Sequence, residues 1–341
     1  MSTMRQVAER AGVSAKTVSR VMHHDRYVSD DVRRRVEQAI RELQYVPNVV
    51  ARTFRSGRDD AIGVAVPDIS DPFFATLTHE IERVARARGV AVFVTSLGDD
   101  GAHERPGVEA LLSRQVFGLI TTPTSADQSY LRPWQERTAM VFIDRPPAKI
   151  TADSVVEDDF GGAHTATSHL IGHGHRRIGF IGDRVTVATT ARRLEGYRAA
   201  LADAGIPDAP EVIALGATSG AEAGRAARDL LQRPDPPTAL FSSNARCSIG
   251  IVPALQSVGR SDMPFISFGD FPLAEALRPP LSVIDQDPGA VGHTAVTRIF
   301  ERLDHPDRRL KRRIVLPVRL LTRGSCGGDH AAQPEVAVSQ R

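Results

Sequence analysis

The hydrophobic pattern changes character along the chain. Up to about residue 45, apolar residues recur every three or four positions, which predicts three short amphipathic helices. From Ile62 onwards, short continuous apolar runs alternate with helical segments instead. The chain therefore divides into a small helical headpiece and a much larger α/β body.

The first two predicted helices have the features of a helix-turn-helix. Helical spacing ends at Ala11, and Gly12 follows where a left-handed turn residue is useful. Ser14 is placed to cap a second helix, in which Val18 and Val21 share one face. In a helix-turn-helix the second helix enters the DNA major groove. A small helical hairpin with a solvated basic face is the alternative interpretation.

Two further segments follow the helix-turn-helix. Ser29 is placed to cap a third helix, which ends near Tyr45. Residues 48–55 (NVVARTFR) can form about two helical turns, which are marginal alone because helix nucleation is costly. We expect this piece to be ordered only when something packs on it, such as DNA and a second copy of itself. Residues 56–60 (SGRDD) have the composition of a polar linker.

The body alternates strands and helices. Apolar runs predict strands at 62–68, 90–96, 117–123, 140–144, 177–183, 212–215, 238–243 and 264–270. Helices are expected at about 75–88, 108–114, 162–172, 193–204, 221–232 and 249–258. The runs 282–286 and 313–321 either cross between sheets or complete them. Continuous apolar strands separated by helices indicate parallel sheets covered on both faces, and their number exceeds one compact sheet.

These elements predict four parts in the chain. We expect a DNA-binding headpiece at 1–46, a hinge helix and linker at 47–60, a two-lobed body at 61–326 and a disordered tail at 327–341. Lobe 1 would comprise about 61–157 and 288–316, and lobe 2 about 158–287 and 317–326. Ligands of such sheets bind outside the carboxyl ends of the strands, so two facing lobes form a hinge-closing binding module.

Charge is unevenly distributed between these parts. Residues 1–58 hold 12 Lys and Arg against 6 Asp and Glu, whereas residues 59–341 hold 31 against 35. A basic head of this kind fits a nucleic-acid module. Cys247 and Cys326 are too few for a disulfide framework. The first helix is charged rather than apolar, and no run approaches the length of a membrane span, so we expect a cytoplasmic protein.

In the order and spacing of these parts, the chain resembles the lactose/galactose repressor family of bacterial transcription regulators. The resemblance runs from about residue 4 to residue 326. Its most specific segments are VAERAGVSAKTVSRVM, YVPNVVAR, IGVAVPDISDPFF, HRRIGFIGD, RLEGYRAAL and LRPPLSVIDQD. It implies a repressor without cofactor that binds palindromic double-stranded operator DNA as a homodimer. A periplasmic-binding-protein-like body would bind a small-molecule effector, a sugar or related metabolite, between its lobes.

The resemblance assigns DNA contacts to the second helix. Ala15, Lys16 and Arg20 match base-contacting positions of the family, and Thr17 and Ser19 match positions that contact phosphates. Arginine suits bidentate hydrogen bonding to guanine, and alanine suits contact with a thymine methyl group. Lys16 suits either a base edge or a phosphate. Lys16 and Arg20 lie four residues apart and so share one helical face.

The resemblance also assigns contacts to the hinge. Asn48, Ala51 and Arg52 match the minor-groove face of the family's hinge helix. Phe54 stands where the family usually has a leucine that wedges into the central base step, and an aromatic ring can also unstack bases. The alternative for Phe54 is a packing contact between two hinge helices or against the body.

Seven residues match the family's effector cleft, namely Phe73, Phe74, Asp144, Arg193, Asn244, Asp270 and Gln286. Carboxylates, amides and an arginine that converge at strand ends suit a polyhydroxy ligand. The alternative for each polar residue is a helix cap or an interlobe hydrogen bond.

Three departures from the family pattern affect the expected ligand. Gly269 replaces the usual acidic ligand contact, with Asp270 one place later, and Ala245 replaces a residue that is usually acidic or Asn. No aromatic residue occurs at 215–219, where the family often stacks a ring on its ligand. These departures count against a simple pentose or hexose and leave a modified sugar, another metabolite or a weak response.

Other functions have less support in the sequence. A solute-binding protein of a transport system would share the two-lobed body, but it has no use for residues 1–58. An enzyme would need a paired acid and base that the sequence does not supply, and GHGHRRIGFIG does not follow a strand into a helix. The histidines at 164, 169, 173 and 175 lack the spacing and the completing ligands of a metal site.

Overall fold

The computed structural model describes residues 3–22, 25, 27–45 and 59–326. The chain divides into two units, one up to Asp59 and one from Asp60 onwards, and each has its own hydrophobic core. The predicted hinge residues Asn48, Ala51, Arg52 and Phe54 and the tail at 327–341 lie outside the described residues.

The smaller unit is a three-helix headpiece. Its helices are α1 (Met4–Ala11), α2 (Ala15–Met22) and α3 (Asp30–Glu42). Their apolar faces meet in one core, in which Val7, Val18 and Val36 are fully buried. Thr3 and Gln6 form a capping box on α1, and Gly12 ends this helix at a φ of 66° in the left-handed region, which glycine adopts without strain. The three predicted helices are therefore present.

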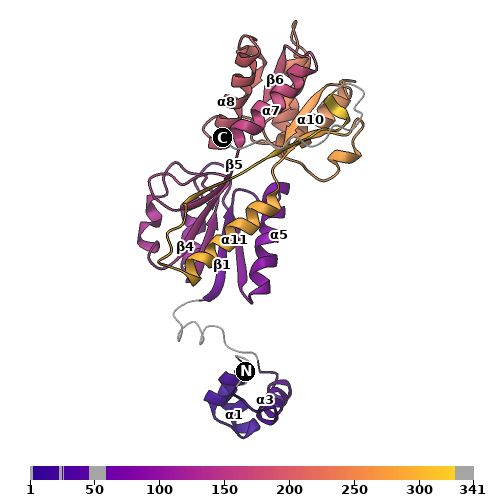
Figure 1. The fold of residues 1–341 in the computed structure, drawn as a ribbon. Helices are drawn as coiled ribbons and strands as arrows, with labels where there is room; N and C mark the ends of the chain where they lie inside the picture. The colour runs from indigo at the N-terminus through magenta and orange to yellow at the C-terminus, as the bar shows by residue number, and fades with distance from the viewer. Residues whose placement is uncertain (1–2, 23–24, 26, 46–58, 327–341) are drawn as a thin grey trace. The chain divides into compact units, whose positions relative to one another are not determined.

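Lobe 1 of the larger unit is built on a six-stranded sheet in the order β11–β5–β4–β3–β1–β2 (Figure 1). Its strands are β1 (Asp59–Val66), β2 (Ala91–Ser96), β3 (Val116–Thr121), β4 (Ala139–Ile143), β5 (Asp153–Glu157) and β11 (Arg313–Leu316). One face packs on α5 (Pro72–Ala87) and α11 (Pro288–Asp304), and the other on α6 (Glu104–Leu112) and the 3-10 helix η1 (Ser129–Trp134). Successive residues of β1 alternate between these two cores, as a strand covered on both sides requires.

Lobe 2 repeats this arrangement with the order β12–β10–β9–β8–β6–β7. Its strands are β6 (Ile178–Ile181), β7 (Ile213–Ala214), β8 (Ala239–Ser242), β9 (Phe265–Phe268), β10 (Ser282–Asp285) and β12 (Arg319–Leu321). The helices α7 (Asp159–Gly172) and α8 (Ala188–Asp203) cover one face, and α9 (Gly220–Leu231) and α10 (Ala245–Ser257) cover the other. Short 3-10 helices follow at η2 (Pro210–Val212), η3 (Ala274–Ala276) and η4 (Gly324–Cys326).

The predicted α/β class with two parallel sheets is confirmed, although β12 runs antiparallel to β10. Of the two alternatives predicted for 313–321, crossing between the sheets is confirmed, because this run forms β11 in lobe 1 and β12 in lobe 2. Pro317 lies between them and has no N–H to continue a sheet ladder. The sequence pattern also does not predict β5, a short strand with an acidic residue at each end whose five residues are all buried.

Several predicted helix starts lie too late. α6, α7, α8 and α10 begin at residues 104, 159, 188 and 245, before the predicted starts at 108, 162, 193 and 249. The side chains of Asp158 and Asn244 accept hydrogen bonds from the backbone N–H groups of Gly161 and Cys247, at 2.9 and 2.8 Å. These caps determine where α7 and α10 begin, whereas the apolar pattern detects only the first buried turn. Within the described residues, no helix combines the length and apolar character needed to cross a membrane.

Candidate DNA interface and effector cleft

The helix α2 presents the predicted DNA-contacting side chains on its outer face. Ala15, Lys16 and Arg20 are exposed, and Thr17 and Ser19 are half-buried. Ser14 precedes the helix, and its hydroxyl oxygen accepts a hydrogen bond from the backbone N–H of Thr17 at 3.1 Å. Short-range caps and the buried valines of the core thus fix the orientation of this face.

Two of these side chains have partners inside the headpiece. The Arg20 guanidinium lies 3.6 Å from a carboxylate oxygen of Asp25, and its side chain is 53% exposed. The hydroxyl groups of Ser14 and Thr17 lie 2.9 Å apart and share a hydrogen bond. Arg20 is therefore oriented by Asp25 while most of its donors face solvent, which is the state that a guanine or phosphate contact needs.

Two arginines of α3 support the headpiece. Arg33 donates a hydrogen bond to the backbone carbonyl of Asp25 at 3.0 Å, and Arg35 donates one to the carbonyl of Ala11 at 3.3 Å. Both carbonyls belong to segments that flank α2. These contacts fix the turn before the recognition helix and the loop after it.

The larger unit contains a cleft of about 60 Å³ between its lobes, at the carboxyl ends of the strands. Six of the seven predicted effector residues line it, namely Phe73, Phe74, Asp144, Arg193, Asn244 and Gln286. They follow or flank strands that are far apart in sequence. They meet because the carboxyl ends of parallel strands lie at one edge of the sheet. Acidic side chains predominate in the lining, which also includes Asp68, Asp71, Asp99 and Asp183.

Arg193 lies in the wall of the cleft but is bonded on several sides. Its Nε donates to a carboxylate oxygen of Asp159 at 2.7 Å, and its Nη1 donates to the backbone carbonyl of Ser243 at 2.6 Å. The guanidinium carbon lies 3.7 Å from the centre of the Phe268 ring. Burial raises the pKa of Asp159 to about 6, although the adjacent Arg193 opposes that shift. Arg193 thus forms a structural ion pair with Asp159, and its side chain also borders the cleft.

The other predicted contacts also have partners within the chain. Asp144 is buried and pairs with Arg145 at 3.0 Å. Asn244 caps α10, and Gln286 donates to the Glu157 carboxyl at 3.1 Å beneath the cleft. Burial, reinforced by the neighbouring Asp144 and Asp159 carboxylates, raises the pKa of Glu157 well above its ordinary value. Asp144, Asn244 and Gln286 thus belong to a polar network formed within the chain itself.

Asp270 does not line this cleft. Its carboxylate pairs with Arg323 at 2.6 Å and borders a neighbouring cavity of about 230 Å³ on the other side of Phe73 and Gln286. Gly269, which replaces the usual acidic residue, adopts a φ of 90°, and a Cβ there would lie 2.7 Å from the Gln286 side-chain oxygen. Any residue other than glycine would be strained in this left-handed conformation, so Gly269 suits the backbone found here.

Sequence reasoning missed three residues that lie together in the cleft. Arg246 on α10 donates to Asp99 of lobe 1 at 2.6 Å and to Asp183 of lobe 2 at 2.7 Å. Asp99 and Asp183 follow β2 and β6. Because ligands bind at the carboxyl ends of parallel strands, these two positions could have been identified from the sequence. Arg246 had no such signal, because its partners lie 147 and 63 residues away.

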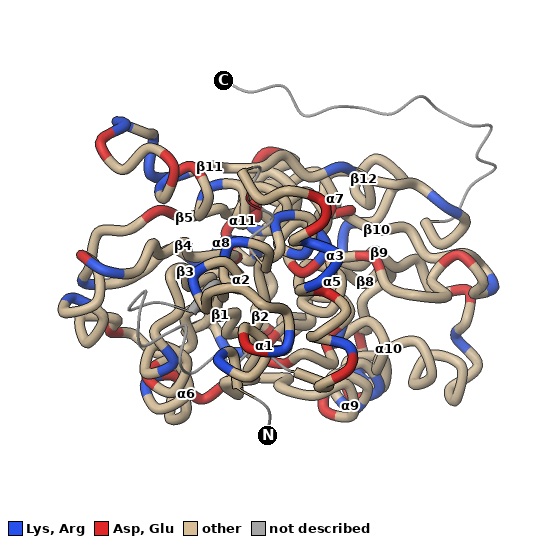
Figure 2. Tube along the Cα trace, turned by 90° about the horizontal axis from the view of Figure 1, so that it is seen from below, with Lys and Arg blue, Asp and Glu red and all other residues tan. Residues whose placement is uncertain are grey.

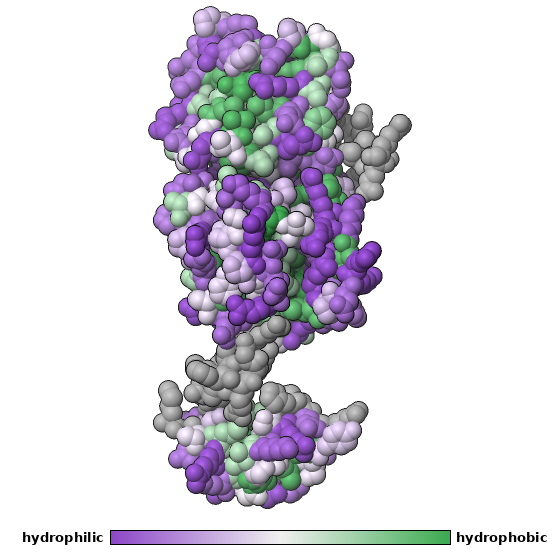
Figure 3. All heavy atoms as spheres, turned by 90° about the vertical axis from the view of Figure 1, so that its left-hand side faces the viewer, coloured by the Kyte–Doolittle hydropathy of each residue, from purple (hydrophilic) through white to green (hydrophobic). Residues whose placement is uncertain are grey.

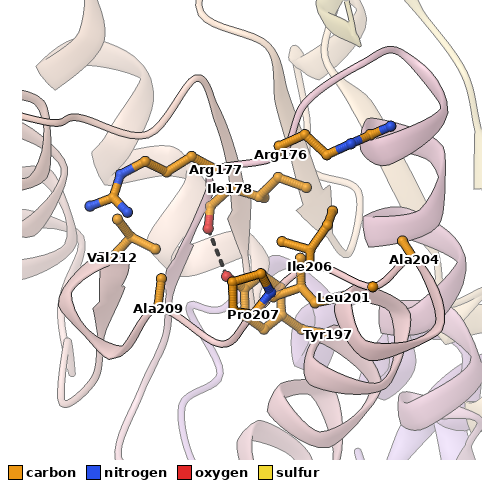
Figure 4. Close-up of a pocket in the computed structure, with 11 residues that line it drawn as sticks. Arg176, Arg177, Ile178, Tyr197, Leu201, Ala204, Ile206, Pro207, Ala209 and Val212 are labelled. Carbon is orange, nitrogen blue, oxygen red and sulfur yellow. Dashed lines mark hydrogen bonds between the residues drawn. The ribbon is translucent and has the colours of Figure 1, made fainter.

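A larger cavity of about 340 Å³ lies elsewhere on lobe 2 and has a different character. Its walls are mainly apolar, and the Tyr197 hydroxyl donates to the Ile178 carbonyl at 2.7 Å (Figure 4). The guanidinium groups of Arg176 and Arg177 point outward on opposite sides of it (Figure 4). The surface of lobe 2 also carries a broad hydrophobic area on the face seen in Figure 3. Without convergent polar groups, this cavity is a poor site for a hydrophilic effector.

The histidines at 164, 169, 173 and 175 have other contacts. The His164 ring bonds to Asp203 at 2.9 Å, His175 bonds to Thr238, and the rings of His169 and His173 lie 4.6 Å apart. In the part of the chain that the structure describes, no group of three or more His, Cys, Asp or Glu side chains could hold a metal ion.

Comparison with known proteins gives two domain matches. Residues 3–48 match the model for bacterial regulatory proteins of the lacI family, and residues 167–326 match the periplasmic binding protein-like domain. The first match covers the headpiece, and the second begins within α7 and covers the rest of lobe 2 together with α11 and β11 of lobe 1.

Whole-chain relatives extend this result. The chain is 32% identical over 332 residues to the ribose operon repressor of Escherichia coli K12, covering 95% of this chain and 100% of the relative. It is 30% identical over 317 residues to the HTH-type transcriptional repressor PurR of Aliivibrio salmonicida, covering 91% and 95%.

A solved structure matches the complete fold. The lac repressor dimer bound to operator and the anti-inducer ONPF has a TM-score of 0.84 and 26% identity, covering 95% of this chain and 99% of that chain. The resemblance found in the sequence is thereby confirmed. The chain belongs to the lacI family of bacterial regulatory proteins.

Proposed function

We propose that the protein represses transcription by binding a palindromic operator as a dimer, under the control of a small molecule in the interlobe cleft. The observation that carries this proposal is the exposed face of α2, where Lys16 and Arg20 share one side of a helix fixed by a buried core. A basic helix of this size fits the major groove. The relatives support the same function, since those compared above are repressors by name.

Within this function, we assign base contacts to Ala15, Lys16 and Arg20, and phosphate contacts to Thr17 and Ser19. Residues 1–46 would bind each half-site, and 47–60 would form the hinge, with Asn48, Ala51, Arg52 and Phe54 in the minor groove. The remaining residues up to 326 would sense the effector, and the site of action would be the cytoplasm. Along the described trace of the larger unit, Lys and Arg are interspersed with Asp and Glu (Figure 2).

We assign the effector to the cleft lined by Phe73, Phe74, Asp144, Arg193, Asn244 and Gln286. Asp270 belongs to the neighbouring cavity, so we place it outside the direct contacts. A ligand that favours one separation of the lobes would shift the population of DNA-competent dimers.

Selection of sequences from random double-stranded DNA with the full-length protein tests the proposal. We expect enrichment of a two-fold symmetric site with two half-sites. The Arg20→Ala variant should lose about 1–3 kcal/mol of discrimination at one base pair in each half-site. Arg5→Ala is the matched control, because Arg5 lies on α1, is 88% exposed and pairs with Glu9 on the same helix.

Two outcomes would contradict the proposal. Enrichment of no sequence would favour a ligand-binding protein without DNA function. Equal base preferences in the Arg20→Ala, Arg5→Ala and wild-type proteins would remove Arg20 from the interface.

A further inference from the structure

The Arg246 guanidinium occupies the mouth of the interlobe cleft. Its Nη1 lies 2.6 Å from Asp99 Oδ2, and its Nη2 lies 2.7 Å from Asp183 Oδ2. Arg246 and Asp183 belong to lobe 2, whereas Asp99 belongs to lobe 1. One planar cation therefore bridges two carboxylates from opposite sides of the cleft.

This bridge joins the two lobes across the cleft. Opening the cleft would break the contact between Arg246 and Asp99 but leave the contact with Asp183 within lobe 2. A second interlobe bond, from Arg184 to the backbone carbonyl of Asp99 at 3.1 Å, would break in the same movement. Two arginines of lobe 2, Arg184 and Arg246, therefore bond to Asp99 of lobe 1.

The space left in the cleft is too small for a metabolite. Its volume of about 60 Å³ corresponds to roughly two water molecules, at about 30 Å³ each, whereas ligand pockets usually measure about 300–1,000 Å³. An effector needs more room than this, which opening of the lobes or movement of a lining side chain would supply. Arg246 is the long side chain at the mouth, and it is partly exposed, whereas Arg193 is buried and bonded on several sides.

The charged residues that line the cleft favour a cation at the position of the Arg246 guanidinium. Asp68, Asp71, Asp99, Asp144 and Asp183 line it, against Arg145, Arg193 and Arg246. Arg145 and Arg193 are already paired with Asp144 and Asp159. Once Arg246 moves away, Asp99 loses its countercharge and the buried Asp183 keeps the longer contact with Arg184 at 3.8 Å, while Asp68 and Asp71 add to the negative potential. A buried carboxylate without a partner is costly, so the incoming ligand must supply positive charge.

We propose that Arg246 is an internal stand-in for a cationic effector, which displaces it and places an ammonium or guanidinium group between Asp99 and Asp183. The inference rests on the proposed function, since it names the ligand class of the same cleft. Neutral sugars supply hydroxyl donors but no charge, and anions would meet uncompensated carboxylates. The absence of the usual acidic side chain at Gly269 agrees with a ligand held at the mouth of the cleft rather than at the family's usual position.

Chemical rescue of Arg246→Ala tests the bridge directly in the full-length protein. The variant should have a lower midpoint of thermal unfolding than wild type, because the buried Asp183 loses its nearer cation, at 2.7 Å, and keeps the longer contact with Arg184 at 3.8 Å. Methylguanidinium chloride at ~20 mM should raise that midpoint by about 2–4 °C relative to the same concentration of NaCl, the shift for a ligand at a few times its Kd. The wild-type protein should show a smaller response to methylguanidinium, because this small cation must displace the protein's own guanidinium without making further contacts.

Arg192→Ala is the matched control, since Arg192 is an exposed lobe 2 arginine paired with Glu195. Rescue of Arg246→Ala but not of Arg192→Ala supports the proposal, and equal shifts in the two variants overturn it. If Arg246→Ala does not fold, Asp99→Asn replaces it, because this change removes only the lobe 1 half of the bridge. That variant should then lose response to the cations described below, and an unchanged response would overturn the proposal.

A panel of small molecules at ~10 mM with the wild-type protein tests the ligand class. Agmatine, putrescine and arginine represent cations, ribose and cellobiose represent neutral sugars, and glucose 6-phosphate and citrate represent anions. We expect stabilisation by at least one cation, and none by sugars or anions. Stabilisation by neutral or anionic compounds alone, or by no cation, overturns the inference. The DNA selection does not depend on these outcomes, so a failed panel with an enriched operator would refute only the ligand class.

Discussion

The headpiece and the interlobe cleft use their polar side chains in opposite ways. On α2, Lys16 and Arg20 are exposed, and Arg20 forms a long ion pair with Asp25, at 3.6 Å. In the cleft, Arg193 and Arg246 are bonded to carboxylates of the same chain at 2.6–2.7 Å. A surface that recognises DNA must keep donors available for phosphates and base edges, whereas a closed cleft must satisfy its own charges before a ligand arrives.

This difference determines whether a substitution has a local effect or changes the stability of a whole unit. The contacts that shape α2 all lie within the headpiece, from the Ser14 cap on Thr17 to the bond between Arg35 and the Ala11 carbonyl, 24 residues apart. The contacts that shape the cleft join strand ends from two lobes, as in the Arg246 bridge. We therefore expect headpiece substitutions to change DNA binding with little effect on the larger unit, and cleft substitutions to change the stability of the larger unit as a whole.

Arg193→Ala should give the largest effect on the cleft side of this comparison. The change leaves the buried Asp159 carboxylate without its cation and removes the group stacked on Phe268. Removing one partner of a buried ion pair typically costs about 3–5 kcal/mol. Urea unfolding of the full-length protein, followed by circular dichroism of the larger unit, measures the loss.

The neighbouring Arg192 supplies the control for this substitution. Its side chain is 56% exposed and pairs with Glu195 at the surface. Arg192→Ala should cost less than about 0.5 kcal/mol, as exposed pairs contribute little. If both variants lost similar stability, the cleft network would have no special role in holding the larger unit.

The same difference explains what the sequence could predict. The headpiece was predictable in detail because its signals are local: apolar spacing, the Gly12 turn and the Ser14 cap all lie within a few residues of one another. The order of strands and helices in the body was predictable for the same reason, since each apolar run is continuous. Six of the seven predicted effector residues lie in one cleft because parallel strands bring their carboxyl ends to one edge.

The features that could not be predicted depend on pairs of charged residues that lie far apart in sequence. The partners of Arg246 lie 147 and 63 residues away, and no local pattern indicates them. Asp270 borders a different cavity because Arg323, near the end of lobe 2, pairs with its carboxylate. A residue's position after a strand predicts that it lies near the cleft, but the pairing of charges decides whether it faces a ligand.

Glu157→Gln should sharpen the comparison through the pH dependence of stability. Burial raises the pKa of Glu157 in the folded state well above its ordinary value of about 4.5. The folded protein therefore binds this proton more tightly than the unfolded chain, and the stability it contributes is complete below pH 4.5. That contribution decreases as pH rises through the folded pKa, by at most about 1.4 kcal/mol per pH unit for one proton.

The glutamine variant cannot ionise at this position and should lack that decrease. Its side-chain oxygen can still accept the bond from Gln286 that Glu157 accepts at 3.1 Å. Denaturant unfolding of both proteins between pH 5 and pH 8 should show the difference between their free energies of unfolding growing with pH in favour of the variant. Parallel pH profiles would mean that the Glu157 carboxyl is not held neutral.

Thr3→Ala tests the headpiece side and should have the smallest effect. The Thr3 hydroxyl accepts a hydrogen bond from the backbone N–H of Gln6, and the Gln6 side chain accepts one from the backbone N–H of Thr3. Losing the cap should cost the headpiece about 1 kcal/mol, which amide exchange of α1 in the full-length protein can measure. Thr3→Ser keeps the hydroxyl and should restore protection. The urea midpoint of the larger unit should not move in either variant, because the two units have separate cores, and a shift there would show that the headpiece and the body are not independent.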